Sequence, residues 1–512
     1  MKQFIKTDRH RTSTADHHSF LAATQSDRAR LIYSAAFRRL QQKAQVFSLE
    51  SNSAVRSRLT HSIEVSHIGR YIVAAIFEKL DSAQNISHEQ KEYWKEHSLA
   101  LSNIVETACL MHDIGNPPFG HFGEAAIAKW ASSSEAKASL CNALSVDIKE
   151  YDDFSPLKDF EHFDGNPQGF RIITKLQGDD GFYGLNLTYT QLAAFLKYTY
   201  SPSTKIGNED APFSKKIGFF DTERSVIENA WNSLSMSHNS RHPLGFLMEA
   251  SDDISYCISD IEDGIEKGII SIEHFRTEIL KGLKEVSQKY EKPDICSELM
   301  KRLQSDKGEA IGVFLSFKTK LSNFLVDSVA QRFIDNYNEF VNLSIKKEII
   351  CKGTLEHDLL KVLKVYTGDF LFTSYEAECM ELSGFSIISG ILEEYQKLLS
   401  LSKTEFTYLV VNDFNKIKEN DLHIHRRLFN RLPKKHLKAY EATIIGSSIP
   451  EVEKLLAKDS TTLEEYFAEK ISEFDSKAEW NLRAHLIVDF VSGMTDQFSM
   501  EFYQMLKGIN VK

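Results

Sequence analysis

The sequence lacks the features that mark secreted, membrane-spanning or strongly basic proteins. Its six cysteines are scattered and form no CxxC pair, which indicates reduced thiols in a cytoplasmic protein and argues against a structural cysteine–zinc site. The first residues lack the apolar core of a secretory signal, and no apolar run is long enough to cross a bilayer. The formal net charge of −11 creates no global attraction for nucleic acid or acidic membranes. We therefore expect no membrane partner and only local binding of anions.

Prolines are also scarce, at 10 in 512 residues, and apolar residues recur at helical spacing over most of the chain. The sequence therefore predicts a mainly α fold with a few short strands. Helices are expected over residues 62–80, 99–112 and 246–268. Residues 152–184 are expected to form a loop with a short helix and a hairpin, and residues 343–350 and 408–411 are the candidate strands.

No internal repeat or low-complexity linker marks a domain boundary. The candidate chemistry ends near residue 270. We therefore divide the chain there into a catalytic core, residues 1–270, and a mostly helical C-terminal region, residues 271–512.

The most informative run extends from His112 to Glu124 and reads HDIGNPPFGHFGE. It places a His-Asp pair at the end of an apolar segment, with His61 upstream and Asp252-Asp253 far downstream. Imidazoles and carboxylates from three helical segments suit divalent Mn, Fe, Ni, Co or Zn and leave positions for water and substrate. A lone His-Asp pair is more often an ordinary helix end. Here the Gly-Asn-Pro-Pro residues that follow the pair, and the second histidine, His121, favour a metal site.

His121 and Glu124 are three residues apart, so they share a face if a helix begins near Gly120. A histidine held by a carboxylate is suited to general acid–base catalysis. The alternative is that Glu124 only favours the positive end of the helix dipole, and the spacing leaves both interpretations open.

The segment from Met248 to Glu266 predicts a two-faced helix. At about 100° per residue, four polar residues lie within about 80° of one another, opposite four isoleucines. The polar residues are Asp252, Tyr256, Asp260 and Asp263. A solvated acidic face is the usual meaning of such a pattern, but without interleaved lysines the carboxylates repel one another unless cations or hydroxyls meet them. Spacing does not choose between Asp252 and Asp253 as a metal ligand.

Candidate cations near this site are Arg58, one helical turn before His61, and Lys197, which precedes Tyr198. They would suit a polyphosphate, although each is also consistent with an ordinary surface cation. A separate basic segment, residues 426–435, contains one phenylalanine and is either a solvated helix face or a contact for single-stranded nucleic acid.

Several motifs in this order resemble the bacterial dGTP triphosphohydrolases of the HD-domain superfamily. They are SDRARLI at 26–32, FRRLQQKAQVF at 37–47, RLTHSIEV at 58–65, the run at 112–124, GNPQGFR at 165–171, LKY at 196–198, KIGFF at 216–220, EASDDISY at 249–256 and GMTD at 493–496. Asp164, Pro167 and Gln497 stand where the family more often has Glu, Ala and Arg. The similarity is dense from Asp27 to Asp263 and sparse between Ser271 and Asp489.

The resemblance implies an HD-domain helical fold with additional helices. It also implies hydrolysis of deoxynucleoside triphosphates, with dGTP preferred, to the deoxynucleoside and tripolyphosphate. The expected cofactor is a divalent metal, Mn or Mg, with Co, Ni, Fe or Zn as further options. The expected partners are the nucleotide, other copies of the chain in a hexamer, and single-stranded DNA. The C-terminal region would complete the site and form the subunit contacts.

The same resemblance implies a role for each matching site residue. The implied metal ligands are His61, His112, Asp113 and Asp252, and the implied catalytic pair is His121 and Glu124. The implied substrate contacts are Gln45, Tyr256 and Asp260 to the sugar, and Arg58, Lys197 and Tyr198 to the triphosphate. Two other functions remain open: an HD-type phosphodiesterase or nucleotidase, and a single-stranded nucleic-acid-binding regulator in which the HD site is secondary.

Overall fold

The computed structural model describes the chain except for Asp16, Ser51, Asp179, Glu209 and residues 305–309, 458–460 and 510–512. Helices dominate the described residues and enclose two hydrophobic cores. The mainly α prediction is therefore confirmed. None of the described helices is both long and apolar enough to cross a membrane.

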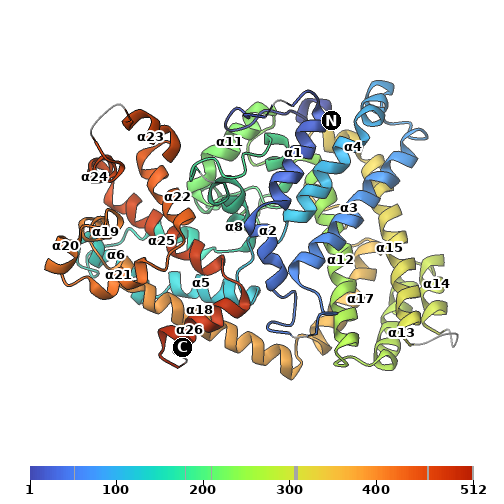
Figure 1. Ribbon diagram of the computed structural model, residues 1–512. Helices are drawn as coiled ribbons and strands as arrows, with labels where there is room; N and C mark the ends of the chain where they lie inside the picture. The colour runs from blue at the N-terminus through green and yellow to red at the C-terminus, as the bar shows by residue number, and fades with distance from the viewer. Residues whose placement is uncertain are drawn as a thin grey trace.

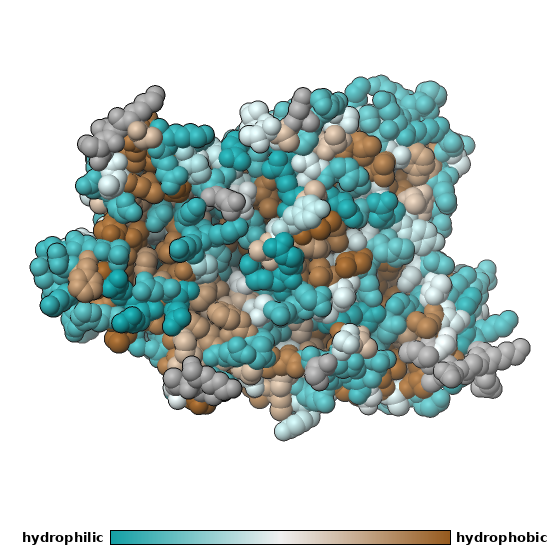
Figure 2. Space-filling view, in the orientation of Figure 1, coloured by the Kyte–Doolittle hydropathy of each residue, from teal (hydrophilic) through white to brown (hydrophobic). Residues whose placement is uncertain are grey.

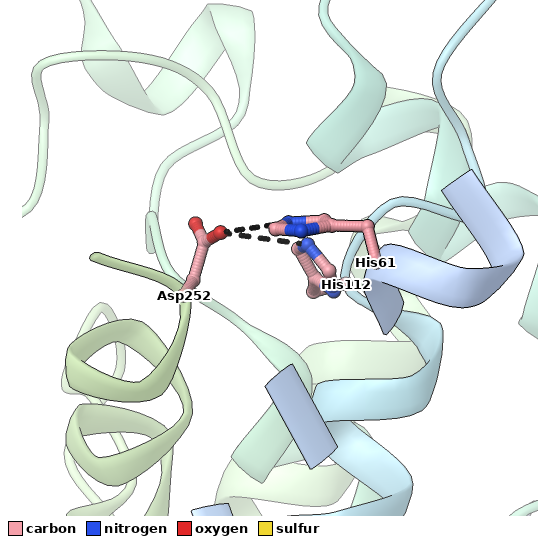
Figure 3. Close-up of side chains that lie close together, drawn as sticks. All are labelled: His61, His112 and Asp252. Carbon is pink, nitrogen blue, oxygen red and sulfur yellow. Dashed lines mark ion pairs between the residues drawn. The ribbon is translucent and has the colours of Figure 1, made fainter. Parts of the chain in front are cut away.

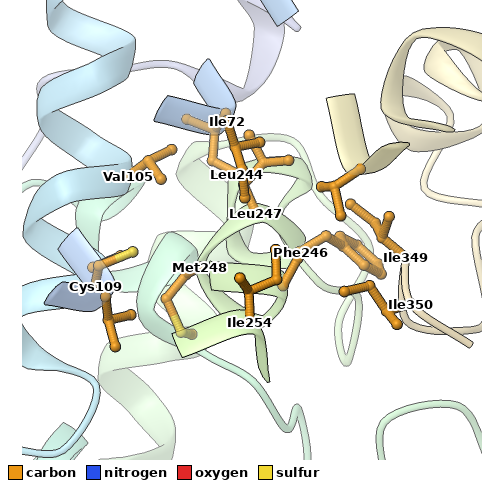
Figure 4. Packing of buried hydrophobic residues seen from close by; sticks show 14 of the residues in the cluster. Ile72, Val105, Cys109, Leu244, Phe246, Leu247, Met248, Ile254, Ile349 and Ile350 are labelled. Atoms are coloured by element: carbon orange, nitrogen blue, oxygen red, sulfur yellow. The ribbon is translucent and has the colours of Figure 1, made fainter. Parts of the chain in front are cut away.

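The first core belongs to a lobe drawn mainly in blue, green and yellow in Figure 1. Its helices are α1 (Phe20–Ile32), α2 (Ala35–Arg39), α3 (Arg58–Leu80), α4 (His88–Met111), α8 (Gly165–Arg171), α9 (Tyr189–Phe195), α11 (Arg224–Ser233), α12 (Pro243–Glu266), α13 (Ile272–Lys289), α14 (Asp294–Leu303), α15 (Ala310–Asp335), α16 (Tyr337–Val341) and α17 (Leu355–Phe370). Helices α3, α4 and α12 pack against one another, and side chains from all three meet in the core shown in Figure 4.

The second core lies in a lobe where α5 and α6 join the orange and red C-terminal helices (Figure 1). Its helices are α5 (His121–Ala131), α6 (Ser134–Leu144), α7 (Lys158–Glu161), α18 (Tyr375–Leu399), α19 (Lys403–Val410), α20 (Phe414–Glu419), α21 (His423–Phe429), α22 (Lys434–Ile445), α24 (Leu463–Glu473), α25 (Ser476–Ser492) and α26 (Asp496–Leu506). Two further helices, α10 (Pro202–Lys205) and α23 (Ile449–Leu456), add no residue to either core. The face in Figure 2 is mainly hydrophilic with scattered apolar residues.

The helices that carry the candidate site begin and end where their sequence provides caps. Ser57 starts α3 with a capping box, because its side chain accepts from Thr60 N and the Thr60 side chain accepts from Ser57 N. Helix α12 starts with Pro243 as its first residue, where a missing N–H costs nothing. Helix α4 starts at His88, eleven residues earlier than expected, because Ser87 caps a polar first half in which only Trp94 is buried before Ala100.

The expected strands are wrong. Residues 408–411 lie at the end of α19, where Phe406 and Leu409 are buried one helical turn apart, and residues 343–350 are irregular chain. The hairpin expected within 152–184 is replaced by short helical turns. Among the described residues, β pairing is confined to two isolated bridges, Arg9 with Thr188 and Ala44 with Ser57.

Candidate active site

One cavity of about 600 Å³ brings together every predicted site residue except Asp260. Helix α3 contributes His61, the end of α4 contributes His112, the start of α5 contributes His121, and α12 contributes Asp252. These residues are far apart in the sequence, and the packing of their helices makes them neighbours.

His61, His112 and Asp252 form a group whose candidate ligand atoms all lie within 4.8 Å of one another (Figure 3). His112 donates Nδ1–H to Cys109 O at 2.7 Å, so its Nε2 faces the group with a lone pair. That nitrogen and both ring nitrogens of His61 are buried without a hydrogen-bond partner among the described residues. Unpaired buried nitrogens beside a carboxylate fit a divalent cation. Asp252 belongs to the group, whereas Asp253 pairs with Lys364 at 2.9 Å.

Asp113 lies beside this group and is held by two other side chains. Its Oδ2 accepts from Arg58 Nη1 and its Oδ1 from Asn116 Nδ2, each at 2.7 Å. Burial would raise the pKa of Asp113, but the nearby His112 and Arg58 lower it to about 2. Asp113 is therefore a carboxylate at neutral pH, 3.5 Å from His112 Nε2, and its role as a ligand stays a prediction. Asn116, whose role the sequence left open, orients this carboxylate.

The expected contact between His121 and Glu124 is present. His121 is the first residue of α5, and its Nδ1 lies 2.7 Å from Glu124 Oε2. Gly165 N donates to the other Glu124 oxygen at 2.8 Å, which fixes the carboxylate. The hydrogen bond to Glu124 raises the pKa of His121 even though the imidazole is partly desolvated. The His121 side chain is 83% exposed at the cavity wall, outside the metal-type group.

On the acidic face of α12, Asp260 and Asp263 are buried, whereas Asp252 and Tyr256 are half-buried at the cavity. A cation that the sequence did not single out meets the buried part. Arg56 pairs with Asp263 at 2.5 Å, with Glu64 at 2.9 Å and with Glu262. Asp260 is fully buried, and burial raises its pKa to about 7. Both Asp260 oxygens lack a hydrogen-bond partner within the described chain, so the carboxyl is able to accept from an added hydroxyl.

Cations also line the cavity. Lys197 Nζ lies 3.5 Å from Asp252 Oδ2 and 3.8 Å from Glu249 Oε1. Lys216 also lines the cavity and pairs with Asp164, although it had no role predicted from the sequence. Lys216 is the first residue of the KIGFF motif, which matches the family. That match was the available indication that Lys216 belongs to the site. Phe372, Met380 and Glu381, around the start of α18, also line the cavity and were missed because that region matches the family sparsely.

Sequence comparison with known proteins identifies two domain families in the chain, and one of them spans several of the cavity residues. The sequence profile of the HD domain matches residues 58–168, and that of the phosphohydrolase-associated domain matches residues 415–505. Three similar proteins align over nearly the whole chain. The deoxyguanosinetriphosphate triphosphohydrolase of Yersinia enterocolitica is 34% identical over 97% of this chain and 95% of its own. The one of Enterobacter sp. (strain 638) is 35% identical over 96% and 95%. The probable one of Pseudomonas aeruginosa is 34% identical over 95% and 93%.

The chain belongs to the deoxyguanosinetriphosphate triphosphohydrolase family. It is therefore a hydrolase with an HD domain, a domain that binds a divalent metal. The HD match contains His61, His112, Asp113, His121 and Glu124, whereas Asp252 lies outside both matched segments. The site of this family member is thus completed by α12 from beyond the matched HD segment.

Proposed function

We propose that the protein hydrolyses deoxynucleoside triphosphates, with dGTP preferred, to the deoxynucleoside and tripolyphosphate. The observation that carries the proposal is the single cavity in which the His61–His112–Asp252 group, the His121–Glu124 pair and Lys197 meet. The similarity over nearly the full length of the chain to proteins named for this activity supports it.

His61, His112, Asp113 and Asp252 would hold the metal, which would lower the pKa of a bound water and polarise an α-phosphate oxygen. Water oxygen adds to the α-phosphorus while the bond from that phosphorus to the 5′-oxygen breaks, so the three phosphates leave together. His121 keeps Nδ1–H on Glu124, which leaves Nε2 as the atom that delivers a proton to the departing 5′-oxygen. Glu124 stabilises the charged imidazole from which that proton comes.

Arg58 and Lys197 would offset the charge of the triphosphate, with Tyr198 beside them. Lys197 already faces Asp252, and Arg58 faces Asp113, so each cation offsets the charge of one carboxylate at the cavity. Without them the carboxylates would repel the substrate.

Tyr256, Asp260 and Gln45 would read the sugar. The unpaired oxygens of Asp260 and the unpaired Oε1 of Gln45 are buried acceptors suited to the 3′-hydroxyl. The Tyr256 ring lines the cavity on the same face of α12, where close packing at C2′ would exclude a ribose hydroxyl. Glu381, a carboxylate without a hydrogen bond or ion pair to another described residue, is an acceptor suited to the N1–H and N2–H donors of guanine.

Replacing Asp260 by alanine should lower kcat/KM for dGTP by about ten- to a hundred-fold when measured above pH 7, where Asp260 is ionised. A hydrogen bond to a charged acceptor contributes roughly 1.5–3 kcal/mol. Metal content should be unchanged. The matched control is Glu266→Gln on the exposed end of the same helix, which should behave as wild type. Equal use of 2′,3′-dideoxy and ordinary nucleotides by the wild-type protein would show that the 3′-hydroxyl is not read.

Product analysis tests the proposal against an HD-type phosphodiesterase or nucleotidase. The purified protein is incubated with Mn or Mg and each dNTP in turn, and the products are resolved by ion exchange. Tripolyphosphate is expected, with dGTP used best. Release of pyrophosphate or monophosphate, or activity confined to monophosphates or cyclic nucleotides, would favour the alternative.

Three further features belong to the proposal: a Mn or Mg cofactor, a homo-oligomer of hexamer size, and a cytoplasmic location consistent with six free thiols. Single-stranded DNA remains a proposed partner through the basic segment 426–435, in which Arg426 stacks on Phe414. A gel mobility shift with a single-stranded oligonucleotide would support this partner if the binding weakens as the salt concentration rises.

A further inference from the structure

The GMTD motif near the C-terminus has no role in the mechanism above. Thr495 caps α26, because its side chain accepts from Phe498 N, and Asp496 is the first helical residue. An aspartate there is ordinarily exposed and simply favours the helix dipole. Asp496 is instead 4% exposed, and both of its oxygens are used by backbone groups of other segments.

Those two bonds join segments that are remote in sequence. Asp496 Oδ2 accepts from Ala44 N at 2.9 Å, and Oδ1 accepts from Phe119 N at 3.1 Å. Ala44 immediately precedes Gln45, and Phe119 lies two residues before His121. One carboxylate at the start of the last helix therefore holds the chain beside a proposed sugar contact and beside the proposed acid–base catalyst.

The turn before His121 needs such support. Phe119 has a φ of 59° and Gly120 a φ of 54°, so a bulky residue occupies the left-handed region that non-glycine residues rarely adopt. Helix α5 begins directly after this turn, with His121. The bond from Phe119 N to Asp496 holds the turn, and so sets the position of the imidazole.

A buried lysine makes a parallel connection. Lys43 is 3% exposed, and its Nζ donates to Asn116 O at 2.6 Å and to Ser492 O at 2.7 Å. Both side chains thus connect the same three segments: the one before Gln45, the loop from Asn116 to His121, and the junction of α25 with α26. Backbone groups are the partners in each case, which points to control of loop position.

We propose that Asp496 is a positioning residue for the reaction, through which the C-terminal helices fix the places of Gln45 and His121 in the cavity. The inference rests on the roles proposed for those two residues. It assigns the phosphohydrolase-associated segment, residues 415–505, a direct part in shaping the HD site.

The test is a double-mutant cycle between Asp496→Asn and His121→Ala in the full-length, metal-loaded protein. Asparagine keeps the size of the side chain but offers one acceptor oxygen in place of two. Asp496→Asn alone should lower kcat about ten- to a hundred-fold and raise KM, with metal content unchanged. In the His121→Ala background it should change kcat less than about threefold, because the imidazole it positions is gone.

Equal losses in both backgrounds would overturn the proposal and leave Asp496 with a structural role only. The matched control is Glu479→Gln, which alters another buried carboxylate. Glu479 lies on α25 and pairs with Arg483 of the same helix and with Tyr440 of α22. This variant should lower Tm while leaving kcat and KM unchanged. If the wild-type protein turns over dNTPs without forming tripolyphosphate, the proposed function is wrong. If the wild type forms tripolyphosphate but the effects of Asp496→Asn and His121→Ala are additive, only the positioning role of Asp496 is wrong.

Amide hydrogen exchange tests the same role in the wild-type protein, so it does not depend on whether a variant folds. In the wild-type protein the amides of Ala44 and Phe119 should exchange as slowly as core amides of α3, since both donate to a buried carboxylate. Fast exchange of either amide in a well-folded sample would overturn the positioning role.

Discussion

His112→Ala should remove both the bound metal and measurable turnover while leaving the helical fold intact. His112 presents Nε2 to His61 and Asp252, and its other nitrogen is held by Cys109 O, so its removal takes away one of the three grouped side chains. Loss of a metal that contributes several kcal/mol to the transition state predicts a decrease in kcat of more than about a thousand-fold. Elemental analysis of metal per chain, circular dichroism and steady-state kinetics are the measurements.

The pair Asp252→Asn and Asp253→Asn provides the matched control. Both residues lie on α12, but Asp252 faces the two histidines and Asp253 pairs with Lys364. The first variant should lose metal and the second should keep it. Full metal occupancy in both His112→Ala and Asp252→Asn would exclude the three-residue group as the metal site.

Asp113→Ala extends the same series to the fourth predicted ligand. If Asp113 binds the metal, as predicted, this variant should lose it together with activity. Retained metal with reduced turnover would instead make Asp113 a group that positions Arg58, which it contacts at 2.7 Å.

His121→Ala should keep the metal and still lose about 10²–10⁴-fold in kcat, the usual contribution of a general acid–base group. The reason is its place: it lies on the cavity wall, bonded to Glu124, and is not one of the three grouped residues. Metal analysis and kcat measured on the same preparation separate this outcome from that of His112→Ala. Loss of metal in His121→Ala would make His121 a ligand and require a different site geometry.

Glu124→Gln should shift the pH dependence in a known direction. The carboxylate raises the pKa of His121 by stabilising its charged form. Glutamine still accepts a hydrogen bond but carries no charge, so the pKa should fall and the His121 ionisation in the rate profile should move to lower pH. Activity should be partly retained. An ionisation that stays in place would mean that another group controls the profile.

The sequence by itself determined the elements whose signal is local. The isoleucine spacing placed a helix over residues 248–266 with one apolar face, and Ile254, Ile258 and Ile261 are buried there. The i, i+3 spacing of His121 and Glu124 anticipated their contact. Such patterns are readable because helical geometry converts separation along the chain directly into separation in space. The motifs of the resemblance likewise named the residues that meet in the cavity.

Only the tertiary structure decided which partner each side chain meets. Spacing could not choose between Asp252 and Asp253, because adjacent residues differ by only about 100° on a helix. The resemblance implied Asp252, and the packing of α12 against α3 and α4 places Asp252 beside His61 and His112 and leaves Asp253 with Lys364. Arg56, the cation that meets the acidic face, lies some two hundred residues from Asp263 along the sequence. Asp496 and Ala44 form a hydrogen bond although nearly the whole sequence separates them. Contacts of this kind depend on how helices pack, which no local periodicity records. The His61–His112–Asp252 group forms within the first lobe, where α3, α4 and α12 pack together. The bonds from Asp496 to Ala44 and Phe119 form only where α26 of the second lobe meets those segments.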